Sequence, residues 1–356
     1  MSIRLIRCVG CAALLVTAAF AETGVFRDPM NTPAAVSAHA SRNPLLAVTR
    51  AGKRLVAVGQ RGMVVYSDDG GVNWTQAKVA VGSDLVAVTF PTPQLGWASG
   101  HDGVVLHSAD GGLSWTKQLD GNAAAHLVEA AYAKRADAGD PAAAKALKAG
   151  RLDYQNGPDL PFLGVWFDNE REGYVSGSFG LLFVTHDGGV NWEPWFDHID
   201  NEQGLNLNSV RGIGGQVFIA AEHGTVFRLD RQQQRFLAAS TGYGGSFFDL
   251  SGTADAVLAF GLRGTVFRSA DGGMRWDAVQ SGIDASITAG TVLDDGQVVL
   301  VGQGGQLLRS RDQGRTFNAM PAARPALFAG VAAAGDGRIV VVGLGGAQLE
   351  SLPKEP

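Results

Sequence analysis

Cysteine is almost absent from the chain, which has 2 cysteines, Cys8 and Cys11, among its 356 residues. Both lie inside residues 1–21, a segment that reads as a secretion signal. Once such a signal is removed, the remaining chain has no thiol group. This excludes disulfide bonds, thiolate metal ligands and a cysteine nucleophile from residues 22–356.

Positive charge is not in excess either, because 29 Lys and Arg residues face 34 Asp and Glu residues, giving a net charge of −5. A nucleic-acid-binding protein normally carries a basic surface, so we expect no nucleic-acid partner. Hydrophobic residues make up 46% of the chain, which supports a large buried core rather than disorder. The 49 glycines, about twice the usual share, exclude a long-helix or coiled-coil protein.

Long hydrophobic runs are missing after the N-terminal segment. Within residues 1–21, two arginines precede an apolar stretch that ends in Ala-Phe-Ala at 19–21, the small-x-small pattern of a signal-peptide cleavage site. The stretch is short for a membrane span. We predict that residues 1–21 are removed and that residues 22–356 form one exported domain, periplasmic or secreted. The alternative, an uncleaved membrane anchor, stays open.

An internal repeat dominates the rest of the chain. A phrase of glycine, an apolar pair, a polar turn and an aromatic residue recurs about every 41 residues, and one interval of 77 residues holds an insertion besides a full period. A period of this length with short β-rich segments is typical of the blades of a β-propeller. Seven copies predict seven blades. The repeat glycines are Gly62, Gly103, Gly180, Gly224, Gly264, Gly305 and Gly346.

Each repeat reads as four short strands. In the second copy, segments at 85–90, 96–99, 104–107 and 115–118 are separated by glycine-rich turns. The sequence therefore predicts an all-β fold, a seven-bladed β-propeller of four-stranded antiparallel blades with short, protected edges. The last copy stops after three strands, so we predict that residues 24–28 close the ring as the outer strand of blade 7.

The insertion covers residues 121–158, between the last strand of blade 2 and the first strand of blade 3. Alanine-rich segments at 123–135 and 142–149 predict two helices, and Asp140-Pro141 supplies an N-cap and a first-turn proline for the second. Inserted loops in repeat proteins often carry binding, and we expect this one to border the face that holds the turns between second and third strands. The alternative is a solvated excursion without a binding role.

A Ser/Thr-x-Asp-x-Gly-x-x-Trp motif follows the third strand in four copies, and a fifth copy ends in Phe317. This pattern is the Asp-box, or bacterial neuraminidase repeat. Its hydroxyl and carboxylate accept N–H bonds inside a turn, and its aromatic side chain packs on the neighbouring strands. We interpret its aspartates as structural, because a catalytic acid is needed once rather than five times. They are Asp69, Asp110, Asp187, Asp271 and Asp312.

The segments between the motifs narrow the family. The apolar strand at 85–90, the Gly-Trp-Ala-Ser-Gly segment at 96–100 and the Asp-box that follows resemble the photosystem II stability and assembly factor family. Blade 3 repeats the pattern with Val-Trp-Phe at 165–167 and Glu-Gly-Tyr-Val-Ser-Gly at 172–177, and the resemblance covers residues 44–352. The chain looks closest to members from non-photosynthetic bacteria, often encoded beside resistance-nodulation-division transporters.

This resemblance implies a non-enzymatic, chaperone-like protein without a cofactor. Members in photosynthetic organisms hold a newly made reaction-centre subunit through a patch of arginines on one face. Here the residue just before the repeat glycine is basic in two of seven copies, so we expect a membrane protein or transporter complex as partner in place of a photosystem subunit. Ordinary solvated turn residues are the alternative. The predicted contacts are Arg61, Asp102, Phe179, His223 and Arg263, and the other two positions are Gly304 and Gly345.

A carbohydrate-active or carbohydrate-binding propeller is the second hypothesis. Sialidases use three arginines, a tyrosine nucleophile and an acidic aspartate, and Phe-Arg-Asp-Pro at 26–29 loosely resembles their Phe-Arg-Ile-Pro start. Arg211, Arg263 and Tyr243 are the available candidates, but no spacing fixes their geometry. Four histidines, His101, His186, His198 and His223, are scattered over the blades without metal-ligand spacing. We therefore predict no catalytic residue, no metal and no small-molecule cofactor.

Overall fold

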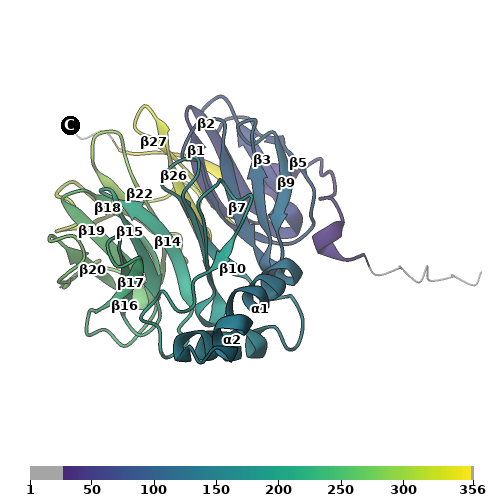
Figure 1. Ribbon diagram of the computed structural model, residues 1–356. Helices are drawn as coiled ribbons and strands as arrows, with labels where there is room; N and C mark the ends of the chain where they lie inside the picture. The colour runs from purple at the N-terminus through teal and green to yellow at the C-terminus, as the bar shows by residue number, and fades with distance from the viewer. Residues whose placement is uncertain (1–26, 354–356) are drawn as a thin grey trace, which may run out of the picture.

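Seven antiparallel sheets follow one another along the chain and stand around a common axis, as Figure 1 shows for the computed structural model. The structure describes residues 27–353. The predicted seven-bladed β-propeller is confirmed, with one sheet for each repeat. The first strands of successive blades contact one another around the ring. These inner strands are β1 (Leu45–Ala51), β6 (Leu85–Thr89), β10 (Phe162–Phe167), β14 (Leu207–Ile213), β18 (Phe247–Thr253), β22 (Ile287–Val292) and β26 (Phe328–Gly335).

The second strand of each blade is almost wholly buried, because both of its sides pack against apolar residues of its own and a neighbouring blade. Uninterrupted apolar runs suit such doubly covered strands. The second strands are β2 (Arg54–Gly59), β7 (Gly96–Gly100), β11 (Gly173–Gly177), β15 (Gln216–Ala221), β19 (Ala256–Gly261), β23 (Val298–Gly302) and β27 (Arg338–Gly343). The third strands are β3 (Val64–Ser67), β8 (Val105–Ser108), β12 (Leu182–Thr185), β16 (Thr225–Asp230), β20 (Val266–Ser269), β24 (Leu307–Ser310) and β28 (Gly346–Ser351).

The outer strands vary most between the blades. Blade 2 gains a fifth strand, β5 (Lys78–Val79), which pairs in parallel with the outer strand and covers its edge. The four strands predicted for this blade agree with the structure within one residue at each end. The outer strands are β4 (Thr75–Gln76), β9 (Ser114–Leu119), β13 (Glu193–Pro194), β17 (Arg235–Ser240), β21 (Asp277–Val279) and β25 (Asn318–Met320).

A β-bulge recurs at the start of every inner strand. In β1, Leu45 pairs with Gly59 and Ala47 with Val58, which leaves Leu46 outside the ladder. The same register shift occurs in the other six blades. The first residue of each inner strand is fully buried, whereas the bulged residue lines the space around the axis. The bulge thus lets the first residue of each inner strand join the core while the next residue lines a central channel.

The insertion forms two antiparallel helices, α1 (Gly121–Asp137) and α2 (Pro141–Asp153), at the lower edge of the view in Figure 1. Each helix begins at an aspartate cap: Asp120 accepts from the amide of Ala123, and Asp140 accepts from the amides of the first turn of α2. Both predicted helices are present and extend one to four residues beyond the predicted bounds at each end. No helix of residues 27–353 has the length and hydropathy needed for a membrane span.

The segment before β1 runs along the outside of the ring. Its 3-10 helix Pro29–Asn31 lies beside blades 1 and 2, where the carbonyl of Pro29 accepts from the amide of Gly82 at 2.8 Å. A second 3-10 helix, Ala40–Arg42, packs against β28 of blade 7.

The predicted closing strand is not found among the described residues. The sheet of blade 7 has three strands there, β26 to β28, and residues 27–44 add none to it. Residues 24–26 and the predicted signal at 1–21 lie outside the described residues. The described ring closes through side-chain packing instead, where Leu45 and Leu55 of blade 1 meet Val340 and Val342 of blade 7.

Candidate partner-binding face

The turns of the propeller fall on two faces. On one face, each turn between a second and a third strand bonds to a linker between blades; the amide of Gly62, for example, donates to the carbonyl of Ser83 at 2.8 Å. We call this the loop face. On the other face, the Asp-box turns bond to the turns between first and second strands, as Gly188 does to Arg171 at 2.9 Å. The arrangement assumed for the predicted contact residues is therefore present.

All five predicted contact residues adopt the left-handed conformation. Their φ angles lie between 52° and 59°, a region of backbone conformation that residues other than glycine rarely adopt. The following glycine also has a positive φ, so two left-handed residues in sequence reverse the chain within one tight turn. The residues are Arg61, Asp102, Phe179, His223 and Arg263.

Polar groups of the blade linkers hold these turns in place. The amide of Arg61 donates to Oδ1 of Asp84 at 2.7 Å, and the amide of Phe179 donates to Oδ1 of Asn206 at 2.8 Å. The linkers thus fix the backbone of these turns and leave four of the five side chains exposed to solvent, those of Arg61, Phe179, His223 and Arg263. Asp102 differs, since its carboxylate accepts from the hydroxyl of Ser83 at 2.6 Å and so belongs to the turn itself.

Apolar side chains are exposed on the same face. Phe179 is 59% exposed and Leu344 is 57% exposed, and Leu262 and Leu327 are also exposed in part. The sequence analysis missed the three leucines. A signal for two of them exists, because Leu262 and Leu344 stand two residues before the repeat glycine, where the other five copies have a polar residue.

The carboxylates of the Asp-box aspartates accept hydrogen bonds from groups of the same turn. Oδ1 of Asp69 accepts from the hydroxyl of Ser67 and from the amides of Val72 and Asn73, at 2.8 to 3.1 Å. Hydrogen bonds from the amide and side chain of Asn73 and from Ser67 lower the pKa of Asp69 to about 2. The hydrogen bond between motif hydroxyl and aspartate recurs at Asp110, Asp187, Asp271 and Asp312.

The comparisons agree with this geometry. The model of the family described as "Photosynthesis system II assembly factor YCF48" matches residues 46–127. A solved structure titled "YCF48 bound to D1 peptide" is 16% identical, covering 93% of this chain and 99% of its own with a TM-score of 0.62. YCF48 from Cyanidioschyzon merolae is 18% identical over 87% of this chain and 96% of its own, with a TM-score of 0.60.

The chain thus has the propeller fold of the two YCF48 structures, and residues 46–127 match the family model. The WD40 propeller domain of Doa1 matches with the same TM-score of 0.62 at 10% identity, over 92% of this chain and 97% of its own. Similarity at these identities shows the fold alone. No curated protein matches the chain.

Both ends of the helical insertion lie at the loop face, because Pro158 at its end contacts Gly121 at its start. Gly121 begins α1 directly beside Gly103 of the blade 2 turn. The rest of α1 packs on the outer edge of blade 3, where the hydroxyl of Tyr132 contacts the carbonyl of Pro194 at 2.8 Å and Asp197 at 2.9 Å. The insertion therefore widens the rim of the ring at blade 3, and its two ends border the loop face beside the blade 2 turn.

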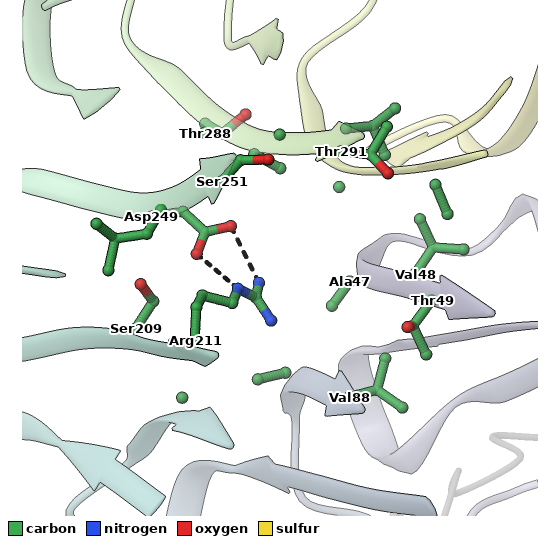
Figure 2. A pocket seen from close by; sticks show the side chains of 18 of the residues that line it. Ala47, Val48, Thr49, Val88, Ser209, Arg211, Asp249, Ser251, Thr288 and Thr291 are labelled. Carbon is green, nitrogen blue, oxygen red and sulfur yellow. Dashed lines mark hydrogen bonds and ion pairs between the residues drawn. The ribbon is translucent and has the colours of Figure 1, made fainter. Parts of the chain in front are cut away.

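The axis of the propeller holds a cavity of about 360 Å³ that is lined by all seven inner strands. Figure 2 shows an ion pair in its wall, between Arg211 of β14, which is partly exposed, and Asp249 of β18, which is buried. Arg211, considered from sequence as a sialidase-type arginine, thus faces the axis. Arg263 and Tyr243 lie on the loop face instead, where the hydroxyl of Tyr243 donates to the carbonyl of Leu262. Within residues 27–353 no cluster of three metal-ligating side chains occurs.

Proposed function

We propose that this YCF48-like propeller is an exported, non-enzymatic binding protein that holds a membrane protein or transporter complex on its loop face during assembly. A related propeller has been solved bound to a D1 peptide, and this similarity favours a protein partner. The similarity to an assembly factor also favours binding over catalysis. The predicted signal at 1–21 supports export to the periplasm or beyond.

The observation that carries the proposal is the combination of rigid turns and exposed side chains on one face. Linker groups such as Asp84 and Asn206 fix the backbone of the turns, so ordering these loops costs little entropy on binding. The projecting groups include two arginines, Arg61 and Arg263, and the aromatic Phe179. Arginine and aromatic residues are enriched in protein–protein interfaces.

The charge of the loop face suggests the kind of partner. Two of the seven turn positions are basic, and apolar side chains stand at Phe179, Leu262 and Leu344. A mixed surface of this kind suits a partner segment with both apolar and acidic residues. Sialidase-like turnover finds less support, because Arg211, Arg263 and Tyr243 do not share one site.

Site-specific photo-crosslinking tests the proposal. A photo-reactive residue is placed at Phe179 or Leu344 on the loop face and, as the matched control, at Val190 or Met274, which are exposed apolar residues of Asp-box turns on the opposite face. We expect one membrane-protein adduct from both loop-face positions and none from the control positions. Equal adducts from both faces, or no adduct from the loop face, would overturn the proposal.

A further inference from the structure

The axial cavity has two chemically different walls. One wall, from blade 7 and blades 1 to 3, is mainly apolar, although it includes Thr49 and Arg50, and the other wall, from blades 4 to 6, carries more polar side chains (Figure 2). A cavity of about 360 Å³ lies within the usual range of small-molecule sites. The apolar wall includes Leu46, Val48, Val86, Val88 and Leu163, and the polar wall includes Asn208, Ser209, Arg211, Asp249, Ser251 and Thr291.

The ion pair on the polar wall leaves one edge of a guanidinium group open. Nε of Arg211 donates to Oδ1 of Asp249 at 2.8 Å, and Nη2 donates to Oδ2 at 3.0 Å. Asp249 is 4% exposed and fixes the orientation of Arg211, whose side chain remains partly exposed to the cavity. Nη1 and the second proton of Nη2 form the other edge, and within residues 27–353 no hydrogen bond occupies it.

Unused hydroxyl groups lie on the same wall. The side-chain oxygen of Ser209 is buried and has no hydrogen-bond partner in the described part of the chain. A buried polar group without a partner is costly unless a ligand or water satisfies it. The side chains of Ser251 and Thr291 line the same cavity and are drawn beside the ion pair in Figure 2.

The remaining charge of the cavity decides the sign of its ligand. Its charged lining residues are Arg50, Arg211 and Asp249. Arg50 is bound to Asp294 at 2.9 Å, and both oxygens of Asp249 accept from Arg211. The open hydrogen-bonding capacity therefore belongs to a cation and to hydroxyl donors. A planar pair of N–H groups matches the two oxygens of a carboxylate.

We propose that the axial cavity binds a carboxylate that is attached to a small apolar body, with the carboxylate on Arg211 and the apolar part against Val48 and Val88. Binding of a free acid at this site does not depend on the loop-face function and is tested without a protein partner. The carboxylate belongs either to a free small acid or to a side chain or terminus of a protein held on the loop face. Binding alone is proposed, without bond breaking.

Butyrate is the probe and butyramide is its neutral isostere. Ligand-observed NMR on the purified protein measures the affinity for each. The test variant combines Arg211→Gln with Asp249→Asn, because removal of Arg211 alone would leave a buried carboxylate unpaired. The matched control combines Arg54→Gln with Asp68→Asn, which removes another bidentate Arg–Asp pair outside the cavity.

We expect saturable binding of butyrate, at least about tenfold weaker binding of butyramide, and a similar loss in the Arg211/Asp249 variant but not in the control. No binding of butyrate, equal binding of the amide, or full binding by the folded variant would overturn the proposal. The source of the carboxylate follows from the Phe179 crosslink: excess butyrate abolishes the adduct if the partner supplies the carboxylate and leaves it unchanged if a free acid does.

Discussion

The hydroxyl of Tyr132 in helix α1 lies 2.9 Å from Oδ1 of Asp197, which follows the outer strand of blade 3. The same hydroxyl accepts from the amide of Phe196 at 3.0 Å, and Asp197 also binds Arg135 at 2.8 Å. Asp197 is buried, so these contacts supply the partners that a buried carboxylate needs. The hydroxyl of Tyr132 and the guanidinium of Arg135 thus both join helix α1 to blade 3.

The Tyr132→Phe variant is expected to lower the free energy of unfolding by about 1–3 kcal/mol, because it leaves buried backbone groups of Pro194 and Phe196 without their partner. Chemical denaturation measures the change, and limited proteolysis within residues 121–158 reports local detachment. Tyr243→Phe is the control, since its hydroxyl is exposed on the loop face. Equal effects of the two variants would contradict the role assigned to Tyr132.

The Ser67→Ala variant tests the Asp-box turn. The hydroxyl of Ser67 accepts from the amide of Gly71 at 2.9 Å inside a buried turn, so its removal is expected to cost about 1–3 kcal/mol. Ser99→Ala is the matched control, because the buried hydroxyl of Ser99 has no hydrogen-bond partner in residues 27–353. We expect little change in the control by the same denaturation measurement. A larger loss at Ser99 than at Ser67 would refute this account of the motif.

Acid is expected to weaken the fold through these turns. Hydrogen bonds hold the pKa of Asp69 and Asp312 at about 2, below the usual value for aspartate. A lowered folded-state pKa contributes stability that is present above pH 4 and is lost as the pH falls toward 2. The melting temperature should therefore fall steeply below pH 4, and less steeply in an Asp69→Asn variant. A parallel fall in both proteins would show that Asp69 does not contribute.

Asp153 at the end of α2 should act in the opposite direction. Burial raises the pKa of Asp153 to about 6, so its ionisation opposes folding as the pH rises from about 4 to 6. The Asp153→Asn variant should have a higher melting temperature than the unmodified protein at pH 7 and the same one near pH 3.5. Asp277→Asn, at an exposed site, is the control. No gain at pH 7 would mean that Asp153 is hydrated.

The repeat made the fold predictable, whereas contacts between blades were not. Spacing of the repeat glycines and the Asp-box is local information, and it gave the seven blades and the strands of blade 2. The pairing of Arg211 with Asp249 joins two blades, and no single repeat contains a sign of it. The parallel strand β5 is equally invisible, because two residues carry no pattern.

In the candidate site, too, the features set by a repeat position could be predicted from the sequence, whereas those set by tertiary contacts could not. The five turn residues were found because each precedes a repeat glycine, and the left-handed geometry follows from that position. The insertion was predicted as two helices from its alanine content, but its seat on blade 3 depends on tertiary contacts of Tyr132 and Asp197. Leu327 lies in a linker of irregular sequence, where no repeat position marks it as exposed.

The double variant Arg61→Ala/Arg263→Ala tests the electrostatic part of the loop face. Both side chains are exposed. Alanine, like arginine, has a β-carbon and must adopt the same positive φ at these positions. The melting temperature of the variant should therefore stay nearly unchanged. Capture of the partner identified by the Phe179 crosslink should weaken several-fold at low salt and less at high salt, because exposed charges mainly steer association. Surface plasmon resonance measures the association rate and the dissociation rate of the complex.

The matched control for this double variant is Arg275→Ala/Arg315→Ala, which removes two exposed arginines of Asp-box turns. If the control loses as much affinity as the loop-face variant, net charge rather than the loop face governs binding.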